Sequence, residues 1–493
     1  MALFISAAIV QMVGTATAAA ASDGARGFAR RGGIEQPPYS TGTRPLLVIA
    51  IRFAGAAEEQ ASGGWVDSFD RSSIGRRFLA PTSTSVNGYM NAASRGAFSY
   101  VPAHESNGVA DDGIVEVSSP NSFNDYPTLW GRAIAAMQAA DSDVAFDAYD
   151  TDGDGELEAT ELTLEVISMG AGARDVGEAD SIQRSGAYLT IDNVSLAQNF
   201  WAAEITPHTN FMTTVHELFH ASFATVDEYG SGVGALSVMG PTAGIPDSAR
   251  FLPSAVTRFQ LGWVTPAVVT GDGSLSLRPG DAAIVADTTA GGSRYFMVEY
   301  REQNGLDASA SGSGVVVWRV DNTVGRGGNG MTRAVELVTP RVLATDRRIE
   351  ACASGEHAMC HSGDNGDVFG LARGDVVPLR YQAAGSGAYS AGPYAGVYLS
   401  DLTGVSGVHV TVHFGEAPVA TTDHGAKVAA TSALRGVRNA APVASVAAAT
   451  STTEVITAAP GITPAPTWPI EAETLLQTLC APDVFDCGSV SHP

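Results

Sequence analysis

Two histidines four positions apart, His216 and His220, are the residues of this sequence with the clearest chemical meaning. The stretch from about Phe211 to Ala224 is compatible with a helix, and residues four apart lie on one face of a helix, so both imidazoles can reach one ion. Two imidazoles and a carboxylate suit zinc, which keeps an open position for water in catalytic sites. Glu217 would be the general base that takes a proton from this water. The H-E-x-x-H pattern therefore indicates a hydrolytic zinc centre, and two packed or exposed histidines are the alternative.

A third ligand has to come from beyond the end of this helix. Asp227, seven residues after His220, lies where a turn could return a carboxylate to the ion, and Glu228 is the competing candidate. The residue types leave this choice open. Further along, the segment Leu236–Gly240 carries Met239. Two interpretations of Met239 remain, a methionine-containing turn beneath the ion or a side chain that fills space in the core.

A second group of candidate ligands follows the pattern of an EF-hand loop. Glycine occupies position six, where the loop turns sharply, and acidic residues occupy the positions that supply side-chain ligands. The expected calcium ligands are Asp150, Asp152, Asp154, Glu156, Glu158 and Glu161. Because Leu162–Met169 is typical of a strand, we expect an isolated structural loop, not a sensor flanked by helices. An acidic solvated turn is the alternative interpretation of this loop. Residues 364–367 are a second, weaker candidate for a cation site, and an ordinary turn is the simpler interpretation there.

The composition excludes several classes of protein. The chain of 493 residues has 52 acidic and 28 basic side chains and a formal net charge of -24. Nucleic-acid binding requires a basic face that displaces counterions from phosphate, and anionic lipid also attracts basic segments, so neither partner is expected. An apolar content of 45% is enough for a core, and the length allows two or three domains at roughly 100–200 residues each. A globular enzyme is allowed, and most of the acidic excess is interpreted as solvated surface.

The beginning of the chain and its cysteines indicate export. Residues 1–21 combine a short apolar run with a stretch of small residues, as a secretory signal peptide does, although basic residues are missing at the start. No other stretch approaches about 18 consecutive apolar residues, so no membrane anchor is expected. The four cysteines form two close pairs, Cys352 with Cys360 and Cys480 with Cys487, which in an exported protein most simply close local disulfides. We expect a monomer that is secreted to the extracellular space.

The hydrophobic pattern predicts the elements that must position these ligands. The apolar runs Leu46–Ile51 and Leu162–Met169 suit buried strands, and Tyr126–Ala140 has apolar residues at helical spacing. From about Val264 onward the pattern changes to short alternating strands separated by glycines. These strands are expected at Ser274–Leu277, Tyr295–Tyr300, Val315–Val320, Ala334–Val338 and Val408–Phe414. The predicted fold class is α+β, mixed in the first part and mainly β in the second.

The same pattern predicts the domain organisation. After a short leader or propeptide remnant at 22–43, a domain at 44–265 holds both groups of candidate ligands, and a β-rich region follows at 266–415. Residues 416–469 consist largely of Ala, Thr, Val, Ser and Pro. Such a segment cannot bury enough apolar surface to offset its ordering entropy, so we expect a linker there and a short cysteine-containing tail at 470–493.

In several segments that include these motifs, the sequence resembles the M6 family of secreted metallopeptidases, the group of immune inhibitor A. The matching segments occur in family order across about residues 44–375, and this ordered agreement is more specific than any single motif. They are Leu46–Phe53, Ser85–Gly96, Phe146–Asp150 with the acidic loop, the pentad at 216–220 with Asp227–Tyr229, Leu261–Trp263, Tyr295–Arg301 and Gly314–Asp321.

The resemblance implies a zincin-like catalytic domain with an active-site helix, completed by the β-rich region, in a calcium-stabilised zinc endopeptidase that cleaves extracellular proteins or peptides. On the family's pattern His216, His220 and Asp227 hold zinc, and Glu217 is catalytic. The family's H-E-x-x-H-x-x-G-x-x-D motif is altered here, because Phe223 stands at the glycine position and Asp227 lies one residue further on. If the chain turns at Phe223, a positive φ there is costly. Alternatively, an inserted residue moves the turn. This departure motivates an alternative function, a catalytically impaired relative that acts as a calcium-dependent extracellular binding protein.

Overall fold

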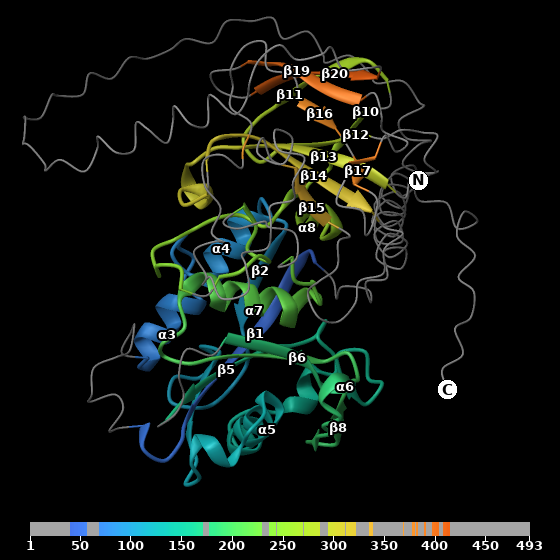
Figure 1. Ribbon diagram of the computed structural model, residues 1–493. Helices are drawn as coiled ribbons and strands as arrows, with labels where there is room; N and C mark the ends of the chain where they lie inside the picture. Colours follow the sequence, from blue (N-terminus) through green and yellow to red (C-terminus); the bar gives the residue numbers. More distant parts are fainter. Residues whose placement is uncertain are drawn as a thin grey trace, which may run out of the picture.

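The computed structural model (Figure 1) describes residues 40–56, 69–170, 177–228, 236–242, 244–269, 271–285, 294–310, 312–321, 335–338, 368, 377–379, 381–382, 389–390, 397–403 and 408–414. The predicted signal peptide, most of the predicted leader, the predicted linker and tail, residues 364–367 and both cysteine pairs lie outside the described residues. The expectations for Cys352, Cys360, Cys480 and Cys487 therefore stay predictions. Within the described ranges, no helix combines the length and the apolar character needed to cross a membrane.

A six-stranded, mostly parallel sheet forms the centre of the first part of the chain. Its strands, in spatial order, are β2 (Phe98–Pro102) and β3 (Ile114–Ser118), β1 (Gly42–Arg52), β5 (Thr163–Met169), β9 (Trp201–Ile205) and β6 (Gly177–Ser181). Strands β2 and β3 pair with successive halves of the same side of β1. The β1–β5 and β5–β9 pairs are parallel, and β6 is antiparallel to β9 at the edge.

Helices cover both faces of this sheet, as Figure 1 shows. Helices α3 (Arg71–Phe78), α4 (Val86–Ala93) and α7 (Phe211–Phe223) lie on one face, and α5 (Leu129–Ala140) lies on the other. Alternate residues of a strand point to opposite faces. In β1, Leu46 and Val48 therefore pack in the core with α7, and Leu47 and Ile49 pack in the core with α5. Burial on both faces explains why the sequence shows one continuous apolar run here.

Two boundaries differ from the predictions. Helix α5 begins at Leu129, three residues after the predicted start, because Pro127 disfavours a helical conformation of Tyr126 and the Thr128 side chain caps the first turn. The folded part begins before residue 44: the Trp263 indole donates to the carbonyl of Ser40 at 2.6 Å, and β1 begins at Gly42.

Small elements connect the main layers. A three-stranded sheet is formed by β4 (Glu156–Leu157), β8 (Val194–Leu196) and β7 (Thr190–Ile191). The short helices are η2 (Phe123–Asp125), η3 (Phe146–Tyr149), α6 (Ile182–Ser185), α8 (Ala255–Gln260) and η7 (Gly305–Asp307). Helix α8 contacts strand β13 of the following part and so joins the two parts of the molecule.

The second part consists mainly of strands in two sheets. The first sheet has the order β10 (Ala267–Val269), β12 (Ala282–Val285), β13 (Arg294–Arg301), β14 (Gly314–Asp321), β15 (Val335–Val338). The second has the order β11 (Gly273–Leu277), β20 (Val408–Phe414), β19 (Val397–Thr403), β16 (Val377–Leu379), and a small pair is formed by β17 (Tyr381–Gln382) and β18 (Tyr389–Ser390). In β13, Phe296 and Val298 pack in a core with the second sheet, whereas Met297 packs with α8. The five strands predicted in this part are confirmed to within one residue at each end.

Candidate metal centre

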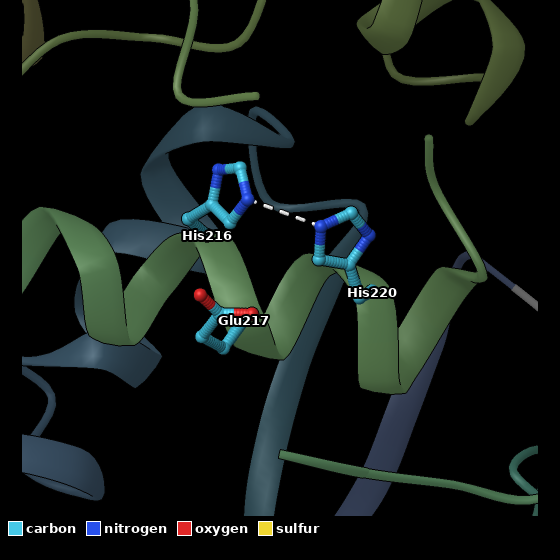
Figure 2. Close-up of side chains that lie close together, drawn as sticks. All are labelled: His216, Glu217 and His220. Carbon is cyan, nitrogen blue, oxygen red and sulfur yellow. Dashed lines mark hydrogen bonds between the residues drawn. The ribbon is translucent and has the colours of Figure 1, made fainter. Parts of the chain in front are cut away.

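Helix α7 carries the histidine pair, as the spacing predicted. The helix begins after Asn210, whose side chain accepts a hydrogen bond from the backbone N–H of Thr213, and it packs against β5, β6 and β9. His216 and His220 project from the same side of the helix and face one another, and the Glu217 side chain lies below His216 in this view (Figure 2). The imidazoles are thus held on a helix that the central sheet supports.

Three potential ligand atoms converge in front of this helix. The two Nε2 atoms of His216 and His220 lie 3.0 Å apart. Oδ1 of Asp227 lies 3.1 Å from Nε2 of His216 and 3.2 Å from Nε2 of His220. Ligand atoms around one tetrahedral zinc ion lie roughly 3.3–3.6 Å from each other, so the three observed distances are only slightly shorter.

The opposite nitrogen of each imidazole is held by a backbone carbonyl. Nδ1 of His216 donates to the carbonyl of Val238 at 2.7 Å, and Nδ1 of His220 donates to the carbonyl of Thr225 at 2.6 Å. In the neutral imidazole the proton is then on Nδ1, and Nε2 presents a lone pair. Two such lone pairs and a carboxylate oxygen repel one another unless a cation lies between them, so the donor set fits a metal ion.

The pKa values of Asp227 and His216 are both shifted in the direction that favours positive charge between these side chains. Burial would raise the pKa of Asp227, but the hydrogen bonds and charges of the two histidines outweigh burial and hold this pKa well below its usual range. Burial would lower the pKa of His216, but Asp227 and Glu217 outweigh it and raise the pKa. A metal ion and protons therefore compete for these ligands.

Glu217 lies beside the ligands with its carboxylate unoccupied. The side chain is 5% exposed, and within the described part of the chain the carboxylate makes no hydrogen bond. Burial raises the pKa of Glu217, and the two histidines oppose this increase. A carboxylate with no competing donor and a raised pKa is suited to accept and release a proton.

The structure separates the two candidates for the third ligand. Asp227 faces the imidazoles, whereas the Glu228 carboxylate points to α8, where it accepts hydrogen bonds from Ser254 Oγ at 2.8 Å and Thr257 Oγ1 at 3.0 Å. Side chains of adjacent residues here point in opposite directions. Asp227 is therefore the carboxylate that the structure places with the histidines.

The chain does not turn at Phe223, and the displaced turn is the one of the two possibilities that the structure has. Phe223 is the last residue of α7, and its ring packs edge-to-face against those of Phe98, Phe219 and Trp263. The left-handed conformation falls on the next residue, Ala224, with φ 47° and ψ 35°. Helix α7 includes residue 223, the glycine position of the M6 pattern, so the chain leaves the helix one residue later than a turn at that position implies, and Asp227 also lies one residue later.

The Met239 segment lies against the ligand-bearing elements. Val238 supplies the carbonyl that orients His216, and the Met239 side chain is buried in the same core as α7. The Thr225 hydroxyl donates to the Met239 sulfur at 3.6 Å. Met239 therefore fills core space and also adjoins the residue whose carbonyl orients His220.

Three of the six predicted calcium ligands have side-chain oxygens that lie close together. Side-chain oxygens of Asp150, Asp152 and Asp154 lie within 4.8 Å of one another. Of the other three predicted ligands, Glu156 and Glu158 are not in this group, and Glu161 accepts hydrogen bonds from Thr151 and from the backbone of Glu158 instead. The loop lies between η3 and β4, without the flanking α-helices of an EF-hand, as the sequence predicted. Its three aspartates form a candidate cation site.

Two further contacts beside the histidine pair are not encoded in any local sequence pattern. The Trp201 ring of β9 stacks on His220, with centroids 6.1 Å apart and an angle of 15° between the planes. Gly177 of β6 lies directly beside Glu217 and Thr213. Both contacts join residues distant in the sequence, so no local pattern could have indicated them.

Comparison of this chain with protein-family models and with curated proteins finds no match.

Proposed function

We propose that this protein is a secreted zinc-dependent metalloendopeptidase with a zincin-like fold, of the kind that the M6 resemblance implies. The observation that carries the proposal is the convergence of His216, His220 and Asp227, with Nδ1 of each imidazole held by a backbone carbonyl. The Glu217 carboxylate, which makes no hydrogen bond within the described residues, lies beside them. A zinc ion held there supplies Lewis-acid chemistry, because it lowers the pKa of water and polarises a carbonyl oxygen.

The residues of the chain have separate tasks in this proposal. The carbonyls of Val238 and Thr225 fix the orientation of the two imidazoles, and the tautomer follows from these hydrogen bonds. Glu217 takes a proton from the attacking water and delivers it to the leaving amine. Its raised pKa favours both transfers, because the carboxyl group gains and loses a proton closer to neutral pH.

The edge of the central sheet supports a peptide as the substrate. Strand β6 is the last strand in the sheet order, and among the described strands it pairs only with β9. It also contacts α7, and its first residue, Gly177, lies next to Glu217. An extended peptide can add to an open strand edge through main-chain hydrogen bonds. A substrate bound in this way would pass the metal centre.

The loop at residues 150–161 is proposed to hold calcium with a structural role. Backbone N–H groups of Gly153 and Asp154 donate to Oδ1 of Asp150, and that of Gly155 donates to Oδ2. These hydrogen bonds determine the shape of the loop. The three aspartate side chains concentrate negative charge, which a hard divalent cation would neutralise.

Metal analysis and proteolysis of the purified full chain test the function. We expect one zinc per chain and cleavage of casein or gelatin that a zinc chelator abolishes and added zinc restores. Glu217→Ala should keep its zinc and lose activity, because the change removes the base but no ligand. Stoichiometric zinc without chelator-sensitive cleavage would count against a peptidase. Calcium without stoichiometric zinc would support the alternative, a calcium-dependent binding protein.

A further inference from the structure

A buried polar cluster connects the metal centre to the second part of the molecule. It starts at Glu228, the residue after the proposed ligand Asp227, whose side chain is 6% exposed. The backbone N–H of Glu228 donates to the carbonyl of Met239 at 2.8 Å. Its carboxylate accepts from the Ser254 and Thr257 hydroxyls at the start of α8. Both the main chain and the side chain next to Asp227 are thus fixed.

Helix α8 is in turn fixed to strand β13. Nη2 of Arg258 in α8 lies 2.5 Å from Oε2 of Glu299 in β13, and both side chains are buried. The other carboxylate oxygen of Glu299 accepts from the Trp318 indole at 2.6 Å and from the backbone N–H of Ala255 at 3.4 Å. A buried charge pair with further hydrogen bonds defines one geometry, so α8 is a rigid support for Glu228.

Strand β13 also reaches the segment that orients His216. Nη1 of Arg301 in β13 donates to the carbonyl of Leu236 at 3.0 Å, two residues before Val238. The same guanidinium is paired with Asp307, through Nε at 2.7 Å. One strand therefore supports the Asp227 side of the metal centre through α8 and the His216 side through Leu236.

We propose that Glu228 is a positioning residue, which fixes the Asp227 carboxylate as a metal ligand by anchoring the adjacent chain to α8. The inference rests on the proposed function, because it takes zinc as the ion. Without the anchor, Asp227 has to be ordered when the ion binds, and this ordering entropy weakens the affinity. The β-rich region is then part of the metal centre's support and not a separable module.

Zinc affinity of the full-length protein, measured by competition with a chromophoric chelator, tests the inference. Glu228→Leu removes the acceptor and keeps similar bulk, and we expect zinc binding to weaken about 10–100-fold. Glu228→Gln keeps one oxygen acceptor for Ser254 and Thr257, so it should restore affinity to within about threefold of wild type. Thr257→Val removes one of the two donors without touching the cap hydroxyl of Ser254, and should give a smaller loss in the same direction.

A control separates positioning from a general loss of stability. Ser168→Ala removes another buried hydroxyl that donates to a buried glutamate, Glu204. Glu204 pairs with Arg132 of α5, on the face of the sheet opposite to α7. We expect it to lower the melting temperature without changing zinc affinity. The cobalt-substituted protein provides a second readout, because its visible absorption bands report ligand geometry and should change in Glu228→Leu but not in Ser168→Ala.

The outcomes are distinguishable. If wild type binds zinc and both Glu228→Leu and Thr257→Val bind it equally well with an unchanged cobalt spectrum, the positioning role is overturned while the proposed function stands. If Glu228→Leu does not fold, Thr257→Val decides: a weaker zinc affinity supports the role, and an unchanged affinity overturns it. If wild type takes up no stoichiometric zinc, the proposed function fails and this inference fails with it.

Discussion

Gly177 of the edge strand β6 approaches Glu217 of α7 so closely that a Cβ added at Gly177 would lie 3.2 Å from Oε1 of Glu217 and 2.2 Å from Cγ2 of Thr213. At 2.2 Å the helix or the strand has to move. The absence of a side chain at this position therefore sets the distance between the proposed general base and the edge along which a substrate would bind.

Gly177→Ala should reduce kcat by about 10–100-fold and leave the zinc content at one per chain. A displacement of about 1 Å at a catalytic group costs rates of this order, and the substitution touches none of the proposed ligands. Proteolysis rates and metal analysis on the same samples measure both quantities. Gly271→Ala is the matched control, since no atom lies within 4 Å of the added carbon there and activity should be unchanged. Equal activity of both variants would contradict the role assigned to Gly177.

Ala224→Gly should stabilise the protein by about 1 kcal/mol. Ala224 has φ 47°, and an L-residue with a side chain pays roughly 1–2 kcal/mol in the left-handed region, part of which the greater freedom of glycine in the unfolded chain offsets. Urea unfolding gives the free energy. As a control, Ala221→Gly inside the same helix should destabilise by about 1 kcal/mol. Destabilisation of similar size in both variants would show that residue 224 does not adopt this conformation in solution.

Removal of calcium should lower the melting temperature of the wild-type protein. An ion that binds only the native state stabilises it by about 2.7 kcal/mol at a free concentration 100 times its Kd. Thermal unfolding in calcium and in excess EGTA measures the difference. Asp152→Asn removes one charge from the aspartate group and should reduce the difference strongly, whereas Asp147→Asn, an exposed neighbour outside that group, should keep it. Identical melting curves of wild type in calcium and in EGTA would argue against a structural ion.

Glu165→Gln should remove a pH-dependent destabilisation. Glu165 on β5 is fully buried, and neither carboxylate oxygen has a hydrogen-bond partner within the described residues. Burial first, then the charges of Glu217 and Glu204, raise its pKa well above the usual value, against the opposing charge of Arg77. Between the unfolded and the folded pKa the unfolded state holds fewer protons than the native state, so stability falls as pH rises above the unfolded pKa of about 4.3.

The measurement is urea unfolding of Glu165→Gln and wild type across the pH range above about 4.3. The variant should gain relative stability by up to about 1.4 kcal/mol per pH unit until the folded pKa is passed. A difference that stays constant with pH would mean that Glu165 titrates at its ordinary pKa.

The sequence by itself determined the parts of this protein that depend on local pattern. Residues four apart on a helix share a face, so the pairing of His216 and His220 followed from their spacing. The strand at Leu46–Ile51 and the strands of the second part followed from apolar and alternating runs, and the start of the aspartate loop followed from its glycine and carboxylate positions.

Only the tertiary structure decided which groups lie beside the two histidines. Asp227 and Glu228 are adjacent carboxylates, and their opposite directions depend on the turn at Ala224 and on hydroxyls of α8 that lie 26 and 29 residues further along. The carbonyl of Val238 and the approach of Gly177 to Glu217 are likewise contacts across the fold. Residue type and spacing encode what a side chain can bind, but the direction in which it points depends on long-range packing, which a one-dimensional pattern does not contain.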